Sequence, residues 1–442
     1  MGIDVGSRIA VQKGEQRWQG ILMPKAAGDP AALVIKLDSG YNIGVGFDKN
    51  AKIEKLKGEE RPPASGLKKS KPKHDPNKPT IVILHAGGTI ASRVDYRTGA
   101  VTPLFTADEL FELFPEIAEF ANIRTQVVFQ MFSEDMEPEH WQTLARKIAE
   151  TIEEGCSGII ITHGTDTMHY TSAALAFMVQ NLPVPVIITG AQRSSDRGSS
   201  DAAMNMICAA NFITNSDFAG VAICMHGSPS DDFCHILPPC KTRKLHTSRR
   251  DTFQAINDSP IAKVSYATRK IEFLKKDYLK KNPAKKVKLD DKFEGKVALV
   301  KVHPGFNPEL LDAYSGYRGI ILEGTGLGHV AINVLDDYTK RHAELLKRLE
   351  SMRNKGVAIF MTSQCIFGRV NLDVYSTGRD LQKAGILPAY MLSETAYVKL
   401  GWVLGHTRDP SEVKKMMDTD YAGEIIERTE EKDFVDERFL GE

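Results

Sequence analysis

Residues 81–90 read Ile-Val-Ile-Leu-His-Ala-Gly-Gly-Thr-Ile, and this stretch decides the fold expected for most of the chain. Its first four residues are apolar and three of them are β-branched, which is typical of a strand buried on both faces of a parallel sheet. The Gly-Gly pair lets the backbone bend where a side chain would clash. The strand therefore presents Thr89 just past its carboxyl end, where open α/β sheets bind small molecules.

Apolar runs and helical patterns alternate after residue 79. Strands are expected at residues 81–84, 124–132, 158–162, 184–190, 220–225, 297–302, 319–322 and 357–362. Helices are expected at residues 106–120, 139–154, 168–181, 201–212, 308–314, 330–348 and 397–404, and a further helix after Pro410 precedes an acidic tail. This alternation predicts a parallel sheet with right-handed crossovers.

With 442 residues the chain exceeds what one hydrophobic core usually supports, so several domains are expected. Five short, partly alternating runs in residues 1–57 predict a small SH3- or Sm-like β-barrel, which suits docking better than RNA binding. Residues 58–79, rich in Pro, Lys, Ser and Gly, are expected to be a linker. A larger α/β domain is expected at 80–274 and a smaller one, with the acidic tail, at 297–442.

The segment 275–296 between these two α/β domains holds nine lysines and four acidic residues. A connector is favoured over a basic binding patch, because charge runs are usually solvated. The whole chain gives no signature of nucleic-acid binding, since 57 Lys and Arg balance 57 Asp and Glu.

Several classes of protein are excluded by composition. No stretch approaches ~18 apolar residues and the start does not resemble a signal peptide, so a cytoplasmic protein without a membrane span is expected. The six cysteines are scattered and are expected to be free thiols. The Cys and His residues at 224–240 lack a Cys-x-x-Cys pair, so no metal site is expected. No Walker motif is present.

Two further loops carry polar side chains suited to chemistry. Residues 162–167, Thr-His-Gly-Thr-Asp-Thr, again follow a buried strand, so Thr165 and Asp166 are expected to face one crevice with Thr89. A third loop at 132–136 adds acceptors. A threonine hydroxyl needs a neighbour to remove its proton, and a lysine of lowered pKa does this well. Residues 241–253 offer Lys241 and Lys244, and the chemistry that fits is acyl transfer through a threonyl ester.

The motifs Gly-Gly-Thr-Ile at 87–90 and His-Gly-Thr-Asp-Thr at 163–167 resemble those of the L-asparaginase/glutaminase family. The resemblance covers residues 79 to about 405 and implies that family's two-domain fold and hydrolysis of a side-chain amide. It implies Thr89 as nucleophile, with an activating set of Thr165, Asp166 and Lys244. Which threonine attacks stays open.

The resemblance also implies a substrate-binding set. Ser133 would hold the substrate α-carboxylate, and Asp166 with Glu134 its α-ammonium group. Lys244 is preferred to Lys241 because the family's lysine precedes a phenylalanine by nine positions, as Lys244 precedes Phe253. The glycine-rich segment 323–329 implies a dimer, since the equivalent loop in the family reaches a neighbouring subunit's site.

The barrel, the linker and the lysine-rich insert together resemble the D-subunit family of archaeal glutamyl-tRNA(Gln) amidotransferases. This implies a subunit that hydrolyses glutamine and passes ammonia to an E-type subunit, which converts Glu-tRNA(Gln) to Gln-tRNA(Gln). ATP and Mg are then expected in the partner, with no cofactor or metal in this chain. Contact with tRNA(Gln) would come mainly through the partner, and the dimer would form part of a heterotetramer. The alternatives are a free-standing cytoplasmic L-asparaginase and a non-catalytic scaffold acting through the barrel.

Overall fold

The computed structural model describes most of the chain, including nearly all of both α/β domains. The described residues are 3–4, 6–14, 16–23, 32–37, 42–46, 51–56, 74–88, 90, 92–94, 101–103, 116–193 and 200–430. Thr89, most of the expected linker and residues 106–115 of the expected first helix lie outside them.

The N-terminal region is a five-stranded antiparallel sheet in the order β4-β3-β2-β1-β5. The strands are β1 (Arg8–Lys13), β2 (Gln16–Leu22), β3 (Ala32–Leu37), β4 (Asn42–Gly46) and β5 (Ala51–Lys55). Ile9, Val11, Ile35 and Val45 form its small core. The five strands expected from the sequence are therefore confirmed.

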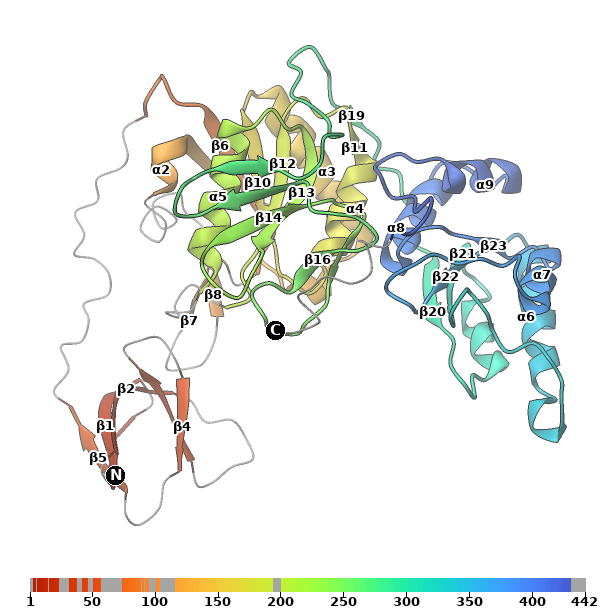
Figure 1. The fold of residues 1–442 in the computed structure, drawn as a ribbon, viewed down its shortest axis with the longest axis horizontal. Helices are drawn as coiled ribbons and strands as arrows, with labels where there is room; N and C mark the ends of the chain where they lie inside the picture. Colours follow the sequence, from red (N-terminus) through yellow and green to blue (C-terminus); the bar gives the residue numbers. More distant parts are fainter. Residues whose placement is uncertain are drawn as a thin grey trace.

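The larger α/β domain is built on an eight-stranded sheet in the order β18-β17-β14-β13-β12-β10-β6-β9 (Figure 1). The strands β6 (Thr80–His85), β9 (Asn122–Val127), β10 (Gly158–Thr162), β12 (Pro185–Thr189) and β13 (Gly220–His226) are parallel. The strands β14 (Phe233–Leu237), β17 (Ala262–Ser265) and β18 (Ile271–Phe273) are antiparallel additions. A separate hairpin pairs β7 (Ser92–Val94) with β8 (Val101–Pro103).

Helices cover both faces of this sheet because its central strands are apolar on both sides. Val82 and Leu84 of β6 face one core and Ile81 and Ile83 face the other. The first core includes α3 (Pro138–Glu153) and α4 (Met168–Met178), and the second includes α2 (Ile117–Phe120) and α5 (Ala202–Asn215). Strand β6 is therefore buried on both faces, as the sequence predicted.

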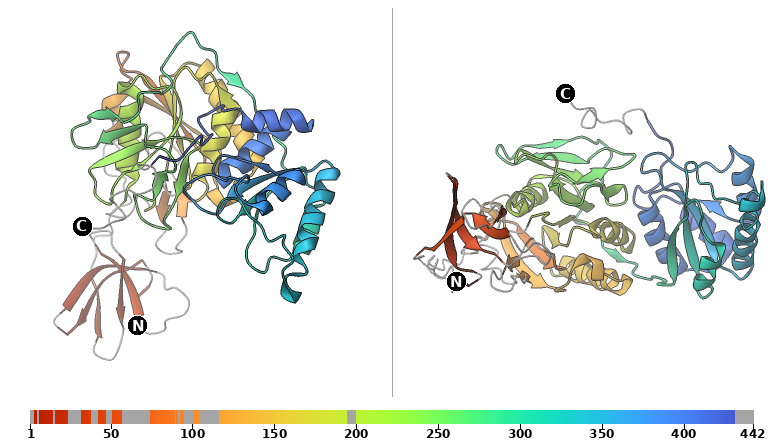
Figure 2. Two further views of the ribbon diagram at one scale, coloured as in Figure 1. Left: turned by 45° about the vertical axis from the view of Figure 1, so that its right-hand side comes forward. Right: turned by 90° about the horizontal axis from the view of Figure 1, so that it is seen from below.

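The smaller domain is a four-stranded parallel sheet with helices on both sides (Figure 2). Its strands are β20 (Val297–Lys301), β21 (Gly319–Gly324), β22 (Ala358–Ser363) and β23 (Leu387–Pro388), and its helices are α6 (His342–Asn354), α7 (Ser376–Lys383), α8 (Ser393–Leu404) and α9 (Pro410–Asp418). Leu345 of α6 and Leu381 of α7 pack on one face. Leu400 and Trp402 of α8 join the first core of the larger domain, so α8 connects the two domains.

The lysine-rich segment 275–296 crosses from one α/β domain to the other in extended form. It forms a bridge between Lys280 and Phe218, and its strand β19 (Lys288–Leu289) pairs with β11 (Val179–Gln180). Near its end the backbone N–H of Glu294 donates to the carbonyl of Gly401 at 2.8 Å. These contacts hold the segment against both domains.

Five expectations about the elements were wrong in part, three of them in the larger domain. The sheet is mixed, because the six residues 227–232 that follow β13 are too few for a parallel crossover and allow only an antiparallel return. The expected strand 124–132 ends at Val127, where the N–H groups of Val128 and Phe129 both donate to the carbonyl of His85. The expected helix 168–181 ends at Met178, because Val179 and Gln180 pair with β19 instead.

The smaller domain gave the other differences. Residues 308–314 form a 3-10 helix, η2 (Pro308–Tyr314), rather than an α-helix. The helix expected at 330–348 begins only at His342. Before it, the Asp336 carboxylate accepts from the N–H groups of Tyr338 and Thr339 and forms the separate turn η3 (Asp337–Thr339), which interrupts the helical pattern.

Candidate active site

Three loops that follow adjacent parallel strands meet at one edge of the larger sheet. In register, His85 at the end of β6 lies beside Thr162 of β10 on one side and Val127 of β9 on the other. The Ala86 N–H then donates to the Thr162 carbonyl at 2.9 Å, and the Gly88 N–H to the Met131 carbonyl at 3.3 Å. The expected convergence of these loops is present in the described residues.

The Gly-Gly pair makes this close meeting possible. Gly88 has φ +83°, and a Cβ there would lie 2.6 Å from the backbone nitrogen of Gly164. Gly87 has φ +104° and lies directly against the Met131 backbone. Side chains would be strained in this conformation and would also clash. The backbone at Gly88 therefore lies against the loop that carries Thr165.

A lysine reaches this loop from a hairpin formed by β15 (Thr242–Lys244) and β16 (Phe253–Ala255). Lys244 is paired across the hairpin with Phe253, which is fully buried. The Lys244 Nζ lies 3.0 Å from Thr165 Oγ1 and 2.6 Å from Asp166 Oδ1. The lysine side chain is 11% exposed and that of Asp166 is 63% exposed. The ammonium group is thus held mostly out of water while its carboxylate partner opens to solvent.

The third loop contacts the second through Ser133. Ser133 begins the 3-10 turn η1 (Ser133–Asp135) and is buried, whereas Glu134 beside it is exposed. The Ser133 Oγ accepts from the Asp166 N–H at 3.2 Å, and Thr167 Oγ1 donates to the Ser133 carbonyl at 2.6 Å. A Cβ on Gly164 would lie 2.7 Å from the Ser133 Cβ, so glycine is needed here too.

Two buried histidines lie beneath these loops. His163 Nδ1 is 2.6 Å from the Gly164 carbonyl, which only a protonated nitrogen can approach, so Nε2 accepts from the Thr171 hydroxyl at 2.9 Å. Burial lowers the pKa of His163 to about 4. His85 contacts the Thr162 hydroxyl at 2.9 Å, and burial lowers its pKa to about 4 as well. Both rings are therefore neutral at pH 7 and support the loops.

The wall behind Thr165 is formed by the loop that follows β12. A Cβ on Gly190 would lie 2.6 Å from the His163 carbonyl and 3.1 Å from Thr165 Cγ2. Asn205, buried on α5, donates to the Gly190 carbonyl at 2.9 Å and to Asp201 Oδ2 at 3.1 Å. Asp201 in turn accepts the N–H groups of residues 192 and 193 at 3.0 and 2.9 Å. This network fixes the wall.

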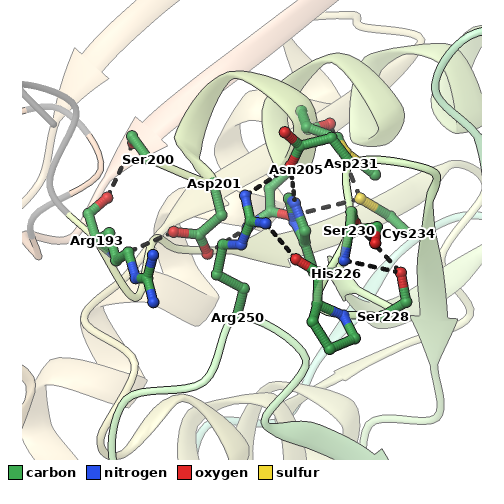
Figure 3. A network of polar contacts seen from close by, with 12 residues as sticks. Arg193, Ser200, Asp201, Asn205, His226, Ser228, Ser230, Asp231, Cys234 and Arg250 are labelled. Atoms are coloured by element: carbon green, nitrogen blue, oxygen red, sulfur yellow. Dashed lines mark hydrogen bonds and ion pairs between the residues drawn. The ribbon is translucent and has the colours of Figure 1, made fainter. Parts of the chain in front are cut away.

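The same network extends to the tip of the lysine hairpin, as Figure 3 shows. His226 Nδ1 is 2.6 Å from Asn205 Oδ1, and its Nε2 is 3.1 Å from Asp231 Oδ1. Arg250 Nη1 donates to the same Asp231 oxygen at 2.6 Å. A continuous set of polar contacts thus joins the hairpin segment after Lys244 to the wall behind Thr165.

The sequence reasoning did not identify this network. Its only sequence signal is the presence of Asp201 and Asn205 one turn apart at the start of a helix that is otherwise almost entirely apolar. In the described part of the chain no group of three or more His, Cys, Asp or Glu side chains is arranged to hold a metal ion. No helix among the described residues is both long and apolar enough to cross a membrane. All six cysteines are free thiols.

Comparison with known families and structures agrees with this architecture. The profile described as Asparaginase, N-terminal matches residues 80–278, and that described as Glutaminase/Asparaginase C-terminal domain matches residues 296–417. The thermostable L-asparaginase from Thermococcus kodakarensis superposes with a TM-score of 0.68 at 32% identity, over 78% of this chain and 99% of its own. L-asparaginase I from Vibrio cholerae gives 0.66 at 26% identity, over 79% and 99%. The expected asparaginase-like fold is confirmed.

Other relatives are similar to this chain over its whole length, including the N-terminal region. The profile described as GatD N-terminal domain matches residues 3–56. The D subunit of glutamyl-tRNA(Gln) amidotransferase from Pyrococcus furiosus is 51% identical over 98% of both chains. The protein of the same name from Methanothermobacter thermautotrophicus is 46% identical over 97% of this chain and 95% of its own. The chain therefore belongs to the family of glutamyl-tRNA(Gln) amidotransferase D subunits, which here combines an asparaginase-like core with an N-terminal β-sheet domain.

Proposed function

We propose that this chain is the glutaminase subunit of a tRNA-dependent amidotransferase. It would hydrolyse L-glutamine and supply ammonia to an E-type subunit that converts Glu-tRNA(Gln) to Gln-tRNA(Gln). One observation carries the proposal: Lys244 Nζ lies 3.0 Å from a threonine hydroxyl and 2.6 Å from a carboxylate, in a chain 51% identical to an amidotransferase D subunit across its length. A free-standing L-asparaginase is less well supported, because the similar asparaginase is 32% identical over 78% of the chain.

The proposed reaction is acyl transfer through a threonyl ester. The Thr89 hydroxyl oxygen adds to the side-chain carbonyl of glutamine, and the C–N bond breaks as the departing nitrogen takes a proton and leaves as ammonia. Water then hydrolyses the ester, which frees glutamate and restores the hydroxyl. Lys244, Thr165 and Asp166 would move the protons, since 3.0 Å and 2.6 Å are within range for direct transfer.

Thr165 is the second candidate nucleophile, because its hydroxyl is the one that contacts Lys244. The two assignments are separated by trapping the ester with substrate, digesting the protein and locating the added mass on Thr89 or Thr165. Ser133 and Asp166 would bind the α-carboxylate and α-ammonium groups of the substrate. Exposed Glu134 would assist with the ammonium group.

The proposal also covers the partner subunit, its cofactors and the assembly that this chain would form. The partner would hold ATP, Mg and most contacts with tRNA(Gln), while this chain would need no cofactor. The chain would form a dimer within a cytoplasmic heterotetramer. Support comes from the relatives' names, which describe a subunit of a tRNA amidotransferase.

Ammonia release tests the function. Release from glutamine and from asparagine is measured for the chain alone and with its E-type subunit and glutamylated tRNA(Gln). We expect a preference for glutamine and strong stimulation by the partner and charged tRNA. Full turnover without them, with a preference for asparagine, would instead identify a free-standing asparaginase. Unchanged hydrolysis in both Thr89→Ala and Thr165→Ala would support a scaffold without this chemistry.

A further inference from the structure

A pocket lies at the boundary between the two α/β domains, next to the lysine hairpin. The centre of a water-sized molecule can occupy about 10 Å³ in it, which is room for about one such molecule, and the pocket is partly open to solvent. Arg243 lines it from the larger domain, and Ser363, Arg369, Ser393 and Glu394 are among the residues that line it from the smaller one. The pocket is not part of the loop cluster that carries Thr165.

Glu394 contributes a polar atom whose hydrogen bonding is incomplete. The residue is 6% exposed, and its Oε1 forms an ion pair of 2.9 Å with Arg243 Nη2. Its Oε2 is buried and has no hydrogen-bond partner among the described residues. Buried polar atoms are nearly always satisfied in folded proteins, so this oxygen indicates a site for a small hydrogen-bond donor.

Adjacent residues of strand β15 contribute to the pocket and to the candidate active site. Arg243 directly precedes Lys244 on β15, and successive side chains of a strand point to opposite faces. Arg243 therefore faces the pocket while Lys244 faces Thr165 and Asp166.

Helix α4 supplies a second buried atom without a hydrogen-bond partner among the described residues. His169 is the second residue of the helix, three residues after Asp166; it is 8% exposed and has a buried Nδ1 without a partner among the described residues. Burial, followed by the charges of Arg243 and Lys244, lowers its pKa to about 3, so the ring is neutral. Its ring centroid is 4.7 Å from that of Tyr170.

Tyr170 follows His169 on α4. Burial and then the charge of Glu394 raise the pKa of Tyr170.

We propose that the pocket formed by Arg243 and Glu394 receives the ammonia released from the substrate amide, which donates an N–H to Glu394 Oε2 before it passes to the partner subunit. The inference rests on the proposed function. The ligand must be small, must donate a hydrogen bond and must tolerate an ion pair that is neutral overall. Ammonia meets all three conditions and is produced on the other side of the same strand.

The variant Glu394→Gln tests this directly. Glutamine keeps an oxygen for Arg243 but replaces the unpartnered acceptor with an NH₂ group. In the complex with the E-type subunit and glutamylated tRNA(Gln), we measure Gln-tRNA formed per glutamate released. We expect this ratio to fall at least about threefold, since one hydrogen bond to a charged group is lost. Amidation driven by added ammonium chloride, which enters without this chain's chemistry, should stay at the wild-type rate.

A matched control is Thr395→Val on the same helix turn. Thr395 Oγ1 donates to the Cys240 carbonyl at 2.7 Å, so the variant loosens the same hairpin segment without altering the pocket lining. Its ratio should match wild type. A wild-type ratio in Glu394→Gln, or an equal loss in Thr395→Val, would overturn the inference and leave the pocket as a site for water only. A wild-type complex that forms no Gln-tRNA from glutamine would instead refute the proposed function.

Discussion

Two lysine–carboxylate pairs in this molecule have the same separation and opposite surroundings. Lys244 Nζ lies 2.6 Å from Asp166 Oδ1, and Lys399 Nζ lies 2.6 Å from Glu424 Oε1. Both side chains of the second pair are fully buried, whereas Asp166 in the first is 63% exposed. Distance alone therefore does not distinguish them.

Their other hydrogen bonds do distinguish them. Lys399 also donates to the carbonyls of Met417 and Thr419, at 2.9 and 2.6 Å, so all three of its ammonium protons have acceptors. Glu424 accepts the N–H groups of Tyr421 and Ala422. Among the described residues Lys244 contacts only Thr165 and Asp166. Lys399, whose three ammonium protons all have acceptors, therefore stabilises the fold. Lys244, which donates to a threonine hydroxyl in a loop open to solvent, is suited to proton transfer.

The largest expected effect comes from Lys244→Met. Removing a proposed member of the proton-transfer set should lower kcat for glutamine by about 10³–10⁴-fold, while the free energy of unfolding changes by no more than about 1 kcal/mol because the pair is partly exposed. Ammonia release and denaturant unfolding measure the two quantities. Lys241→Met, at the other lysine of the segment, is the matched control and should keep wild-type turnover. A kcat within tenfold of wild type in Lys244→Met would remove this lysine from the mechanism.

The same substitution in the buried pair, Lys399→Met, should lower stability and leave turnover unchanged. Lys399→Met leaves Glu424 charged and buried, and should lower the free energy of unfolding by about 3–5 kcal/mol. Turnover per folded molecule should be unchanged, as measured at a temperature where the variant is folded. The double variant Lys399→Met/Glu424→Leu should regain most of the loss. If Lys399→Met were as stable as wild type, the comparison between the two pairs would fail.

The neutral histidine His163, beneath the Lys244–Asp166 pair, should make the free energy of unfolding depend on pH. Burial lowers the pKa of His163 from 6.5 to about 4, so between these values the unfolded chain binds a proton that the folded chain does not. Its contribution to stability is therefore complete above pH 6.5 and is lost as the pH falls toward 4. Between pH 7 and pH 5, wild type should lose about 2 kcal/mol more than His163→Gln. Denaturant unfolding at both pH values measures this, and parallel losses in the two proteins would refute it.

Sequence periodicity predicted the buried strands β6 and β10, whose loops lead to the exposed pair, but not the hairpin of β15 and β16 that carries Lys244. The apolar run of β6 and the glycines after it predicted a loop at a sheet edge. Lys244 was chosen only through the family resemblance, by its nine-residue spacing from Phe253, which is its partner across the hairpin. Other features depend on residues far apart in the chain. The pairing of Arg243 with Glu394 joins the two domains, and no local pattern marks it. Thr89, the first residue singled out, lies outside the described residues.

The smallest expected effect lies at the tip of the lysine hairpin. Arg250 pairs with Asp231 at 2.6 Å and also donates to the Pro229 carbonyl, but Asp231 is 64% exposed. Water competes for that carboxylate, so Arg250→Gln should cost no more than about 1 kcal/mol of stability. Because Asp231 also contacts His226 in the network behind Thr165, a loosened hairpin should reduce kcat by a few-fold with KM nearly unchanged. A reduced kcat with unchanged stability would show that the network positions Lys244. A change in stability alone would assign Arg250, like Lys399, to the fold.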